Sequence, residues 1–193
     1  ARYEVLGLLG QGGMGVVYHV RDTTRGRENA LKTLAPGRSE DIVERFLTEA
    51  QVMFRLEHDN IVRVYDFGKD GETYFLTMEL IRGKNLRQLL NARQNKGFPL
   101  AEVIRMGIQA ADALNYAHSQ KPEAVVHRDI KPVNIMVEEE TGRIVVTDFG
   151  IAKLMADTGG GETQIGTAAT HTVFAGTVPY SAPEQFLAAG GGR

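Results

Sequence analysis

The stretch His127-Arg128-Asp129-Ile130-Lys131-Pro132-Val133-Asn134 gathers an imidazole, two cations, a carboxylate and a carboxamide in one short segment. Apolar runs at 124–126 and 144–146 lie on either side of it, and the second run leads into Asp148. We expect both runs to form short strands that bracket a polar loop and bring Asp129, Lys131, Asn134 and Asp148 together. Magnesium-dependent phosphoryl transfer requires an acid that takes a hydroxyl proton, a cation, and oxygen ligands for the metal. The stretch therefore makes that chemistry the working hypothesis.

Composition describes an ordinary globular chain of 193 residues with 42% apolar and 24% charged residues. The net charge of −2 argues against nucleic acid or an anionic membrane as the main partner. Cysteine is absent, which excludes disulfides and thiolate metal sites. No apolar run reaches the roughly 18 residues of a membrane span. Both ends, at Ala1 and Arg193, look like cuts through a longer polypeptide, so we expect a cytoplasmic domain, with a membrane-anchored parent as one alternative.

A glycine-rich turn connects the first two expected strands, at 3–9 and 16–21. It reads Gly10-Gln11-Gly12-Gly13-Met14-Gly15, and glycines let backbone N–H groups approach phosphate oxygens closely. Alone this pattern is weak, because a flexible hairpin turn explains it equally well. The β-branched pair Val16-Val17 predicts a strand after the turn, whereas a dinucleotide-binding turn is followed by a helix.

Lys32 lies in a strand expected at 29–34, where a solvent-facing lysine would be unremarkable. A functional role requires a carboxylate partner, and the helix expected at 40–56, with Ser39 as its N-cap, supplies one in Glu49. The apolar stripe of that helix consists of Ile42, Phe46, Ala50 and Met53. Glu49 lies beside this stripe, so a pair with Lys32 is possible, although periodicity does not prove it.

Along the later part of the chain, the hydrophobic pattern changes from one typical of strands to one typical of helices. A second hairpin is expected from strands at 61–67 and 73–80, followed by a linker at 81–84 and helices at 85–94 and 100–119. The longer helix should face the core with Ile104, Ile108, Ala111, Leu114 and Tyr116. We expect His58 and His118 to be structural, since no His/Asp spacing indicates zinc.

Six motifs occur in a fixed order along the chain. They are Gly10-x-Gly12-x-x-Gly15-x-Val17, Ala30-Leu31-Lys32, Glu49, His127-Arg128-Asp129-x-x-x-x-Asn134, Asp148-Phe149-Gly150 and Ala182-Pro183-Glu184. Together they resemble the eukaryotic-type serine/threonine protein kinases, and the wording of the glycine turn is most similar to the bacterial branch. The resemblance covers essentially the whole chain. It implies an α+β, bilobal kinase-like fold with an ATP-binding lobe at 1–80, a hinge at 81–84 and the first part of a mainly helical lobe at 85–193.

The resemblance also implies roles for individual residues. Lys32 would hold the α- and β-phosphates of ATP, with Glu49 anchoring it, while Asp129 receives the hydroxyl proton. Lys131 would neutralise the γ-phosphate, and Asn134 and Asp148 would hold Mg²⁺. The expected nucleotide contacts are Leu9, Gly10, Gln11, Gly12, Gly13, Met14, Gly15, Val17, Ala30, Lys32, Met78 (the gatekeeper), Glu79, Leu80, Met136 and Asp148. For Val17, Ala30 and Met136, simple core packing is the alternative interpretation.

Control by phosphorylation is implied by Arg128, which precedes the catalytic acid and whose guanidinium can bind a phosphothreonine. The threonine-rich stretch at 157–172 is expected to be a loop, and Thr170 and Thr172 are the favoured phosphorylation sites; solvated loop threonines are the alternative. Lys131 and the downstream Thr177 resemble the serine/threonine class, in which Thr177 helps to shape the acceptor pocket.

Two other functions stay open: a pseudokinase that only docks partners, and a small-molecule kinase. Intact catalytic positions count against the first, and the glycine turn with the Ala-Pro-Glu segment counts against the second. The expected partners are ATP, protein substrates and a second copy for trans-autophosphorylation. In the family Glu184 pairs with an arginine on a later helix, so we expect residues 1–193 alone to be poorly stable and weakly active.

Overall fold

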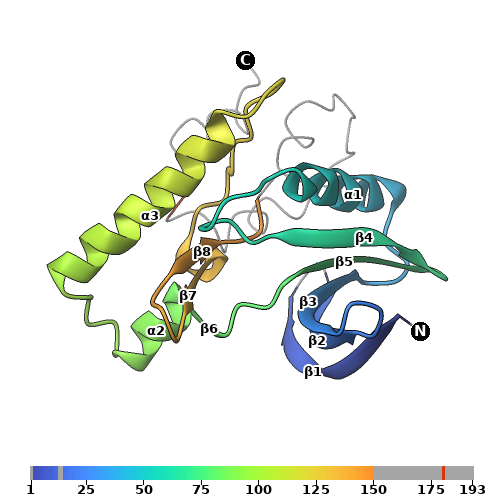
Figure 1. Cartoon of the computed structure of the whole chain (residues 1–193), viewed down its shortest axis with the longest axis horizontal. Coiled ribbons are helices and arrows are strands. Elements are labelled where there is room, and N and C mark those ends of the chain that lie inside the picture. Colours follow the sequence, from blue (N-terminus) through green and yellow to red (C-terminus); the bar gives the residue numbers. More distant parts are fainter. Residues whose placement is uncertain (1, 13–14, 150–179, 181–193) are drawn as a thin grey trace, which may run out of the picture.

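A computed structural model describes residues 2–12, 15–149 and 180 of the chain. Its N-terminal half is an antiparallel sheet of five strands with one helix beside it (Figure 1). In spatial order the strands are β1 (Tyr3–Gln11), β2 (Gly15–Asp22), β3 (Arg27–Leu34), β5 (Thr73–Glu79) and β4 (Val64–Asp70). The expected hairpin around the glycine turn is confirmed as β1 paired with β2.

Gly15 is required where β2 begins. It pairs with Leu34 of β3, and a Cβ atom on Gly15 would lie 1.7 Å from the carbonyl oxygen of Thr33. Any side chain would therefore push β2 away from β3 at the point where the turn meets the sheet. The last glycine of the turn thus has a structural reason that is independent of any ligand.

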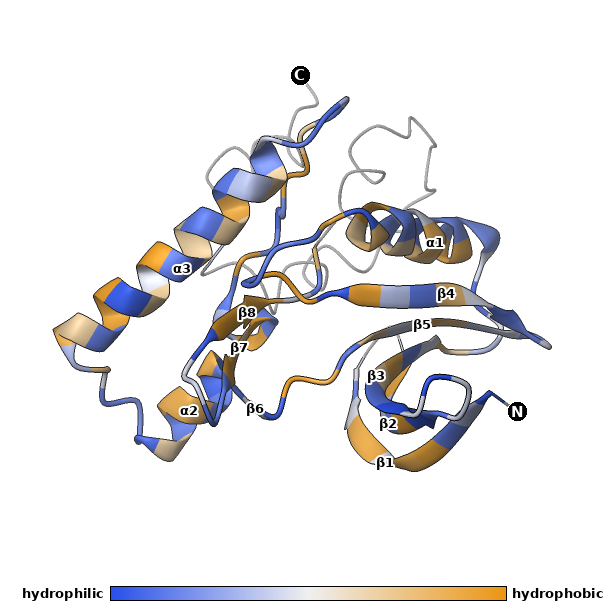
Figure 2. Cartoon of the chain, viewed as in Figure 1, coloured by the Kyte–Doolittle hydropathy of each residue, from blue (hydrophilic) through white to orange (hydrophobic). Residues whose placement is uncertain are grey.

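Helix α1 (Glu40–Phe54) packs against β4 through an apolar face. Phe46, Ala50 and Met53 are buried, as the spacing predicts, and Glu49 is buried with them at 9% exposure. Figure 2 shows apolar residues on the side of α1 that faces the sheet and polar residues on the outer side. Ser39 occupies the N-cap position, but its side chain makes no capping hydrogen bond. Burial of the apolar face therefore holds this helix more than its cap does.

The strand predicted at 61–67 was expected to begin at Ile61, and that start is wrong. β4 starts at Val64, because the backbone of the preceding residues bonds to β8 in the other half of the chain. Val62 N–H donates to the Val146 carbonyl at 2.9 Å, and Val146 N–H donates to the Asn60 carbonyl at 2.8 Å. This connection joins the two halves of the molecule.

The described part of the second half, up to Phe149, holds three short strands and two α-helices. These are β6 (Gly83–Asn85), α2 (Leu86–Ala92), α3 (Leu100–His118), the 3₁₀ turn η1 (Pro132–Asn134), β7 (Ile135–Glu138) and β8 (Ile144–Val146). The strands form an antiparallel sheet in the order β6-β7-β8. Asn85 caps α2 reciprocally with Gln88, its side chain accepting from the Gln88 amide at 2.9 Å. β6 begins within the expected 81–84 linker.

The predicted strand at 124–126 does not form. Val125 N–H instead donates to the Ala117 carbonyl at 2.9 Å, which closes the end of α3. The partner of β8 is β7, which the sequence analysis missed and which starts directly after Asn134. The polar loop is therefore bracketed by β7 and β8 on its C-terminal side, and not by one strand on each side.

The face that α3 turns to the core also differs from the expected one. Met106, Ala113 and Ala117 are buried, whereas Ile104 and Ile108 are 52% and 65% exposed. Ala113 and Ala117 are small enough for α3 to pack closely on β8, and Met106 is buried in the same core. Within the described residues, no helix is long and apolar enough to cross a membrane.

Candidate active site

His127 is the buried support of the polar loop. It is 1% exposed and its ring lies 4.5 Å from that of Phe149, centroid to centroid. Nε2–H donates to the Thr147 carbonyl at 3.0 Å, and Nδ1 accepts from the Asp129 amide at 3.2 Å. A ring that donates at one nitrogen and accepts at the other is neutral, and burial lowers the pKa of His127 accordingly. His127 thus fixes the backbone of both Asp129 and the strand end that leads to Asp148.

Asp129, Lys131 and Asn134 form one hydrogen-bonded group, as the sequence predicts. The Lys131 ammonium lies 2.6 Å from Asp129 Oδ2. The Asn134 amide nitrogen donates to the Asp129 carbonyl oxygen at 2.9 Å and to its Oδ2 at 3.3 Å. Asn134 is 5% exposed, so its side chain is locked by burial as well as by bonding. The carboxylate of Asp129 is held in a fixed direction by groups on both sides.

Asp148 follows β8 and is connected to this group through its neighbour Thr147. Thr147 N–H donates to the Asn134 carbonyl at 2.9 Å, which places the next residue beside the loop. Both Asp148 (φ 51°) and Arg128 (φ 60°) have backbones in the left-handed region, which is unfavourable for residues other than glycine. Strain of this kind persists only where the surroundings enforce it. Here the buried His127 and Phe149 anchor the two strained positions.

Lys32 reaches Asp148 across the boundary between the two sheets. Its Nζ lies 2.6 Å from Asp148 Oδ1. Burial opposes the charged ammonium, but the charges of Asp148 and then Glu49 outweigh it, so the pKa of Lys32 is raised. The expected Lys32–Glu49 ion pair is not formed: among the described residues, Lys32 is ion-paired with Asp148 alone. The anchoring role of Glu49 stays a prediction.

Glu49 is nevertheless part of the same site. It shares a cavity of about 10 Å³ with Lys32, Asp148 and Met78. Burial raises the pKa of Glu49 to about 7; Lys32 lowers it, and the charges of Asp148 and Asp129 add to the rise. A carboxyl that titrates near neutrality beside a lysine and two acids is typical of a functional site.

Of the nucleotide contacts expected from the resemblance, Lys32, Met78 and Asp148 line this cavity, and others lie on the neighbouring strands. Ala30 pairs with Met78 in the β3–β5 register, and Val17 pairs with Lys32 in the β2–β3 register. Met136 lies on β7, two residues after Asn134. The Glu79 N–H donates to the Arg63 carbonyl at 2.8 Å. The backbone group of Glu79 that could contact a ligand is therefore its carbonyl. Leu80 follows β5 directly.

The glycine turn is closed by two backbone bonds between Gly12 and Gly15, at 2.9 and 3.3 Å. A Cβ atom on Gly10 or Gly12 would meet no atom within 4 Å, so both positions face open space. Leu9 and Gln11 are exposed on the same strand end. Five predicted site residues lie outside the described residues: Gly13, Met14, Thr170, Thr172 and Thr177.

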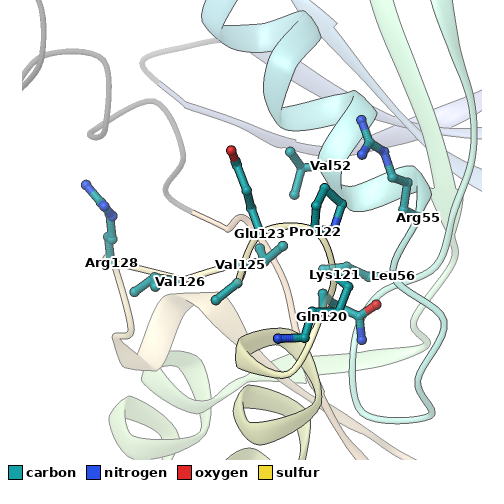
Figure 3. A pocket seen from close by; sticks show the side chains of 11 residues that line it. Val52, Arg55, Leu56, Gln120, Lys121, Pro122, Glu123, Val125, Val126 and Arg128 are labelled. Carbon is teal, nitrogen blue, oxygen red and sulfur yellow. The ribbon is translucent and has the colours of Figure 1, made fainter.

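Arg128 faces a different cavity of about 380 Å³ between the end of α1 and the segment at 120–128. Its walls combine apolar Leu56 and Val125 with cationic Arg55 and Lys121. Figure 3 shows Arg128 and Arg55 at opposite sides of this cavity. The sequence analysis singled out Arg128, but nothing in the local pattern indicated Arg55 or Lys121 as its neighbours.

Oxygen donors in the site suit a hard cation. Asn134 directs its amide nitrogen to Asp129, and its amide oxygen has no hydrogen-bond partner among the described residues. Asp148 is half-exposed and presents a second carboxylate oxygen beyond the one bound by Lys32. A carboxylate and an amide oxygen fit Mg²⁺, which is commonly held by few protein ligands together with phosphate oxygens. In the described ranges, no three His, Cys, Asp or Glu side chains are grouped so that they could hold a metal ion by themselves.

Sequence reasoning missed the residue that connects this site to its surroundings. Arg143, just before β8, bonds to Glu79, Glu138 and the Asp59 carbonyl. Its position next to an apolar strand is a common place for a solvated arginine, so no local signal identifies it. Asn60 was missed for the same reason; its side chain bonds to the Ile144 carbonyl at 2.7 Å.

Comparison with known proteins gives consistent matches. The family model described as "Protein kinase domain" matches residues 3–191. A probable serine/threonine-protein kinase of Streptomyces coelicolor is 42% identical over 190 residues, covering 95% of this chain and 26% of that protein. The serine/threonine-protein kinase PrkC of Bacillus subtilis is 37% identical over 187 residues, with the same coverage. The chain spans about a quarter of the length of these curated relatives.

A solved structure agrees with the sequence matches. The PknI kinase domain of Mycobacterium tuberculosis superposes with a TM-score of 0.69 at 33% identity. The superposition covers 78% of this chain and 60% of that one. Strand order, helix α1 and the polar loop therefore belong to a known arrangement.

Proposed function

The chain belongs to the protein kinase domain family, and we propose that its parent protein transfers the γ-phosphoryl group of ATP to serine or threonine hydroxyls of proteins, its own included. The expected α+β, two-lobe kinase fold is confirmed. The relatives named above are bacterial, in agreement with the wording of the glycine turn.

One observation carries the proposal: the Asp129–Lys131–Asn134 group is tied to the Lys32–Asp148 pair, because Thr147, the residue before Asp148, donates its N–H to the Asn134 carbonyl. In the transfer, the acceptor hydroxyl oxygen bonds to the γ-phosphorus as the bond to the β–γ bridging oxygen breaks, and ADP leaves. Asp129, which Asn134 holds by hydrogen bonds, would orient the hydroxyl and take its proton. Lys131 would offset charge on the transferred group.

The remaining residues serve nucleotide and metal. Lys32 would turn from Asp148 to the α- and β-phosphates, and Glu49 would then become its carboxylate partner. Asn134 and Asp148 would hold Mg²⁺, which offsets the negative charge of the phosphates. Val17, Ala30 and Met136 would enclose adenine beneath the glycine turn, with Met78 behind it and Glu79 and Leu80 at its edge.

Regulation by phosphorylation is a further part of the proposal. Arg128 lines a cavity whose described walls carry two other cations, Arg55 and Lys121, and one acid, Glu123. Such an excess of positive charge favours a phosphate group. Thr170 and Thr172 stay the favoured phosphorylation sites on sequence grounds, and Thr177 the residue that shapes the acceptor pocket. Trans-autophosphorylation by a second copy stays a prediction, as does a cytoplasmic location.

The test is a transfer assay with γ-labelled ATP on the full-length parent protein and its Asp129→Asn variant. We expect wild-type label on protein serine and threonine, and a loss of at least about 10²-fold in the variant. Asp70→Asn, an exposed acid at the end of β4, is the matched control and should transfer normally. Transfer that survives in Asp129→Asn, binding without transfer, or transfer only to a small molecule would each refute the proposal.

A further inference from the structure

We propose that Arg143 is a positioning residue that sets the width of the adenine pocket by clamping the start of the hinge to β7. This role rests on the proposed ATP-dependent function. It extends that function to a residue outside the kinase motifs. Arg143 touches neither reacting atoms nor the expected nucleotide contacts other than Glu79. It acts through the segments that it joins.

Four hydrogen bonds define the clamp. Arg143 Nη2 donates to Glu79 Oε1 at 2.6 Å and to Glu138 Oε1 at 3.2 Å. Its Nε donates to Glu138 Oε2 at 3.4 Å, and its Nη1 donates to the Asp59 carbonyl at 2.7 Å. One planar guanidinium thus holds the end of β5, strand β7 and the connection between α1 and β4. A lysine has no such fork and cannot make these contacts together.

Burial and charge make the clamp stronger than a surface ion pair. The side chains of Arg143, Glu79 and Glu138 are each about one-quarter exposed. Burial opposes the charged guanidinium, but its hydrogen bonds to Glu138 and Glu79 outweigh burial, so the pKa of Arg143 is raised; Arg143 in turn lowers the pKa of Glu138. Thr141 adds support, since its hydroxyl donates to Glu138 Oε2 at 2.5 Å and accepts from the Arg143 amide at 3.0 Å.

The joined segments are the two walls of the expected adenine site. Glu79 is the last residue of β5 and lies just before the hinge at 81–84, so it belongs to the wall of the adenine site that leads into the hinge. Glu138 lies two residues after Met136 on β7, so both side chains point to the same face of that strand. A guanidinium that bonds Glu79 and Glu138 at once fixes the distance between these walls. Bonding to the Asp59 carbonyl also ties that distance to the segment that follows α1.

Without the clamp, the hinge and β7 would have to be ordered by the nucleotide itself, and that ordering lowers affinity. The phosphate end of the site depends on Lys32 and Asp148, which Arg143 does not touch. Loss of Arg143 should therefore weaken binding of ligands that contain adenine and leave binding of phosphate chains unchanged. A general loss of structure would weaken both.

The experiment uses the full-length protein with Arg143→Met and Arg143→Lys. We expect Arg143→Met to raise the KM for ATP about tenfold, equivalent to about 1.4 kcal/mol, with kcat changed less than about twofold. Inhibition by magnesium tripolyphosphate, which lacks adenine, should be unchanged. Arg143→Lys should give an intermediate KM, and amide hydrogen exchange at residues 79–82 should quicken in both variants.

Arg105→Met is the matched control. Arg105 donates to the Gly142 carbonyl at 2.8 Å, so it supports the same β7–β8 turn without reaching the hinge. Glu79→Gln removes the charge at the other end of the clamp. The double variant Glu79→Gln/Arg143→Met should raise the KM for ATP no further than Arg143→Met alone. If Arg143→Met does not fold, Glu79→Gln with Arg143→Lys carries the same comparison.

The clamp proposal is refuted if Arg143→Met leaves the KM for ATP unchanged. It is also refuted if Arg143→Met weakens binding of tripolyphosphate as much as binding of ATP. The same KM change in Arg105→Met would refute it as well. A wild-type protein that binds no ATP overturns the proposed function itself, and that failure is visible before any variant is made. Binding of ATP by wild type, with no change in the variants, refutes the clamp alone.

Discussion

Replacing Glu49 by glutamine should make the kinase domain more stable at pH 8 while it destroys activity. Glu49 is 9% exposed on α1, and burial raises its pKa from the ordinary 4.5 to about 7. Above neutral pH the folded protein therefore carries a buried carboxylate whose ionisation is unfavourable. Glutamine keeps the shape of the side chain and removes that charge.

The magnitude follows from the pKa difference. At about 1.4 kcal/mol per pKa unit, the gap between 4.5 and about 7 amounts to about 3 kcal/mol as an upper value. Because the folded state holds this proton more tightly than the unfolded state, the stability that Glu49 contributes is complete below pH 4.5. It declines as pH rises and is lost as pH passes about 7.

Urea unfolding of wild type and Glu49→Gln, without nucleotide or magnesium, measures this effect from pH 5 to pH 8. We expect the two proteins to have similar free energies of unfolding at pH 5. At pH 8 the free energy of unfolding of the variant should be higher by up to about 3 kcal/mol. Glu44→Gln is the control, because Glu44 is exposed on the same helix and should give no pH-dependent difference. Transfer activity of Glu49→Gln should fall about 10²-fold, since Lys32 loses the partner that would hold it on the phosphates.

A difference between variant and wild type that is the same at pH 5 and pH 8 would refute the reasoning. A variant less stable than wild type at pH 8 would also refute it, because it would mean that Glu49 is charged and well paired in the folded state. Lys32 would then bind Glu49 in the free protein, contrary to the 2.6 Å pair with Asp148.

Two further predictions test the scaffold under the site. Gly83→Ala would place a Cβ atom 1.9 Å from the Val137 carbonyl oxygen, so the β6–β7 pairing must open, and we expect a loss of about 1–3 kcal/mol in urea unfolding. Gly97→Ala, where a Cβ meets nothing within 4 Å, should change little, and equal effects at both glycines would contradict the argument. Phe149→Ala empties a fully buried site against the His127 ring and should cost about 3–5 kcal/mol, with loss of transfer activity. A change below about 1 kcal/mol in the same assay would show that Phe149 does not support the loop.

Local patterns predicted the elements that carry the motifs. The strand–glycine turn–strand unit, the strand with Lys32 and the inward position of Glu49 on α1 follow from periodicity and glycine placement. Each depends on residues close in sequence, so the chain itself contains the signal. The Asp129–Lys131–Asn134 group also forms as predicted, because its members lie within six residues of one another.

Elements that depend on partners far along the chain were missed. β7 was not predicted because four residues become a strand only through pairing with β6 and β8. The run at 124–126 has strand-like residues, but its backbone bonds to the end of α3. The core face of α3 was assigned to Ile104, Ile108, Ala111, Leu114 and Tyr116, whereas packing against the rest of the fold buries Met106, Ala113 and Ala117.

The sequence by itself determined which chemical groups this protein has and in what order they occur: a glycine turn, two lysines, three acids and an amide. Tertiary structure decided which of these groups touch. In the folded chain Lys32 forms its ion pair with Asp148 and not with Glu49, and Arg143 lies between the end of β5 and β7. The physical reason is that composition and periodicity fix what a segment can form, while ion pairs and buried pKa values depend on distances across the fold. Those distances are set only when both lobes pack.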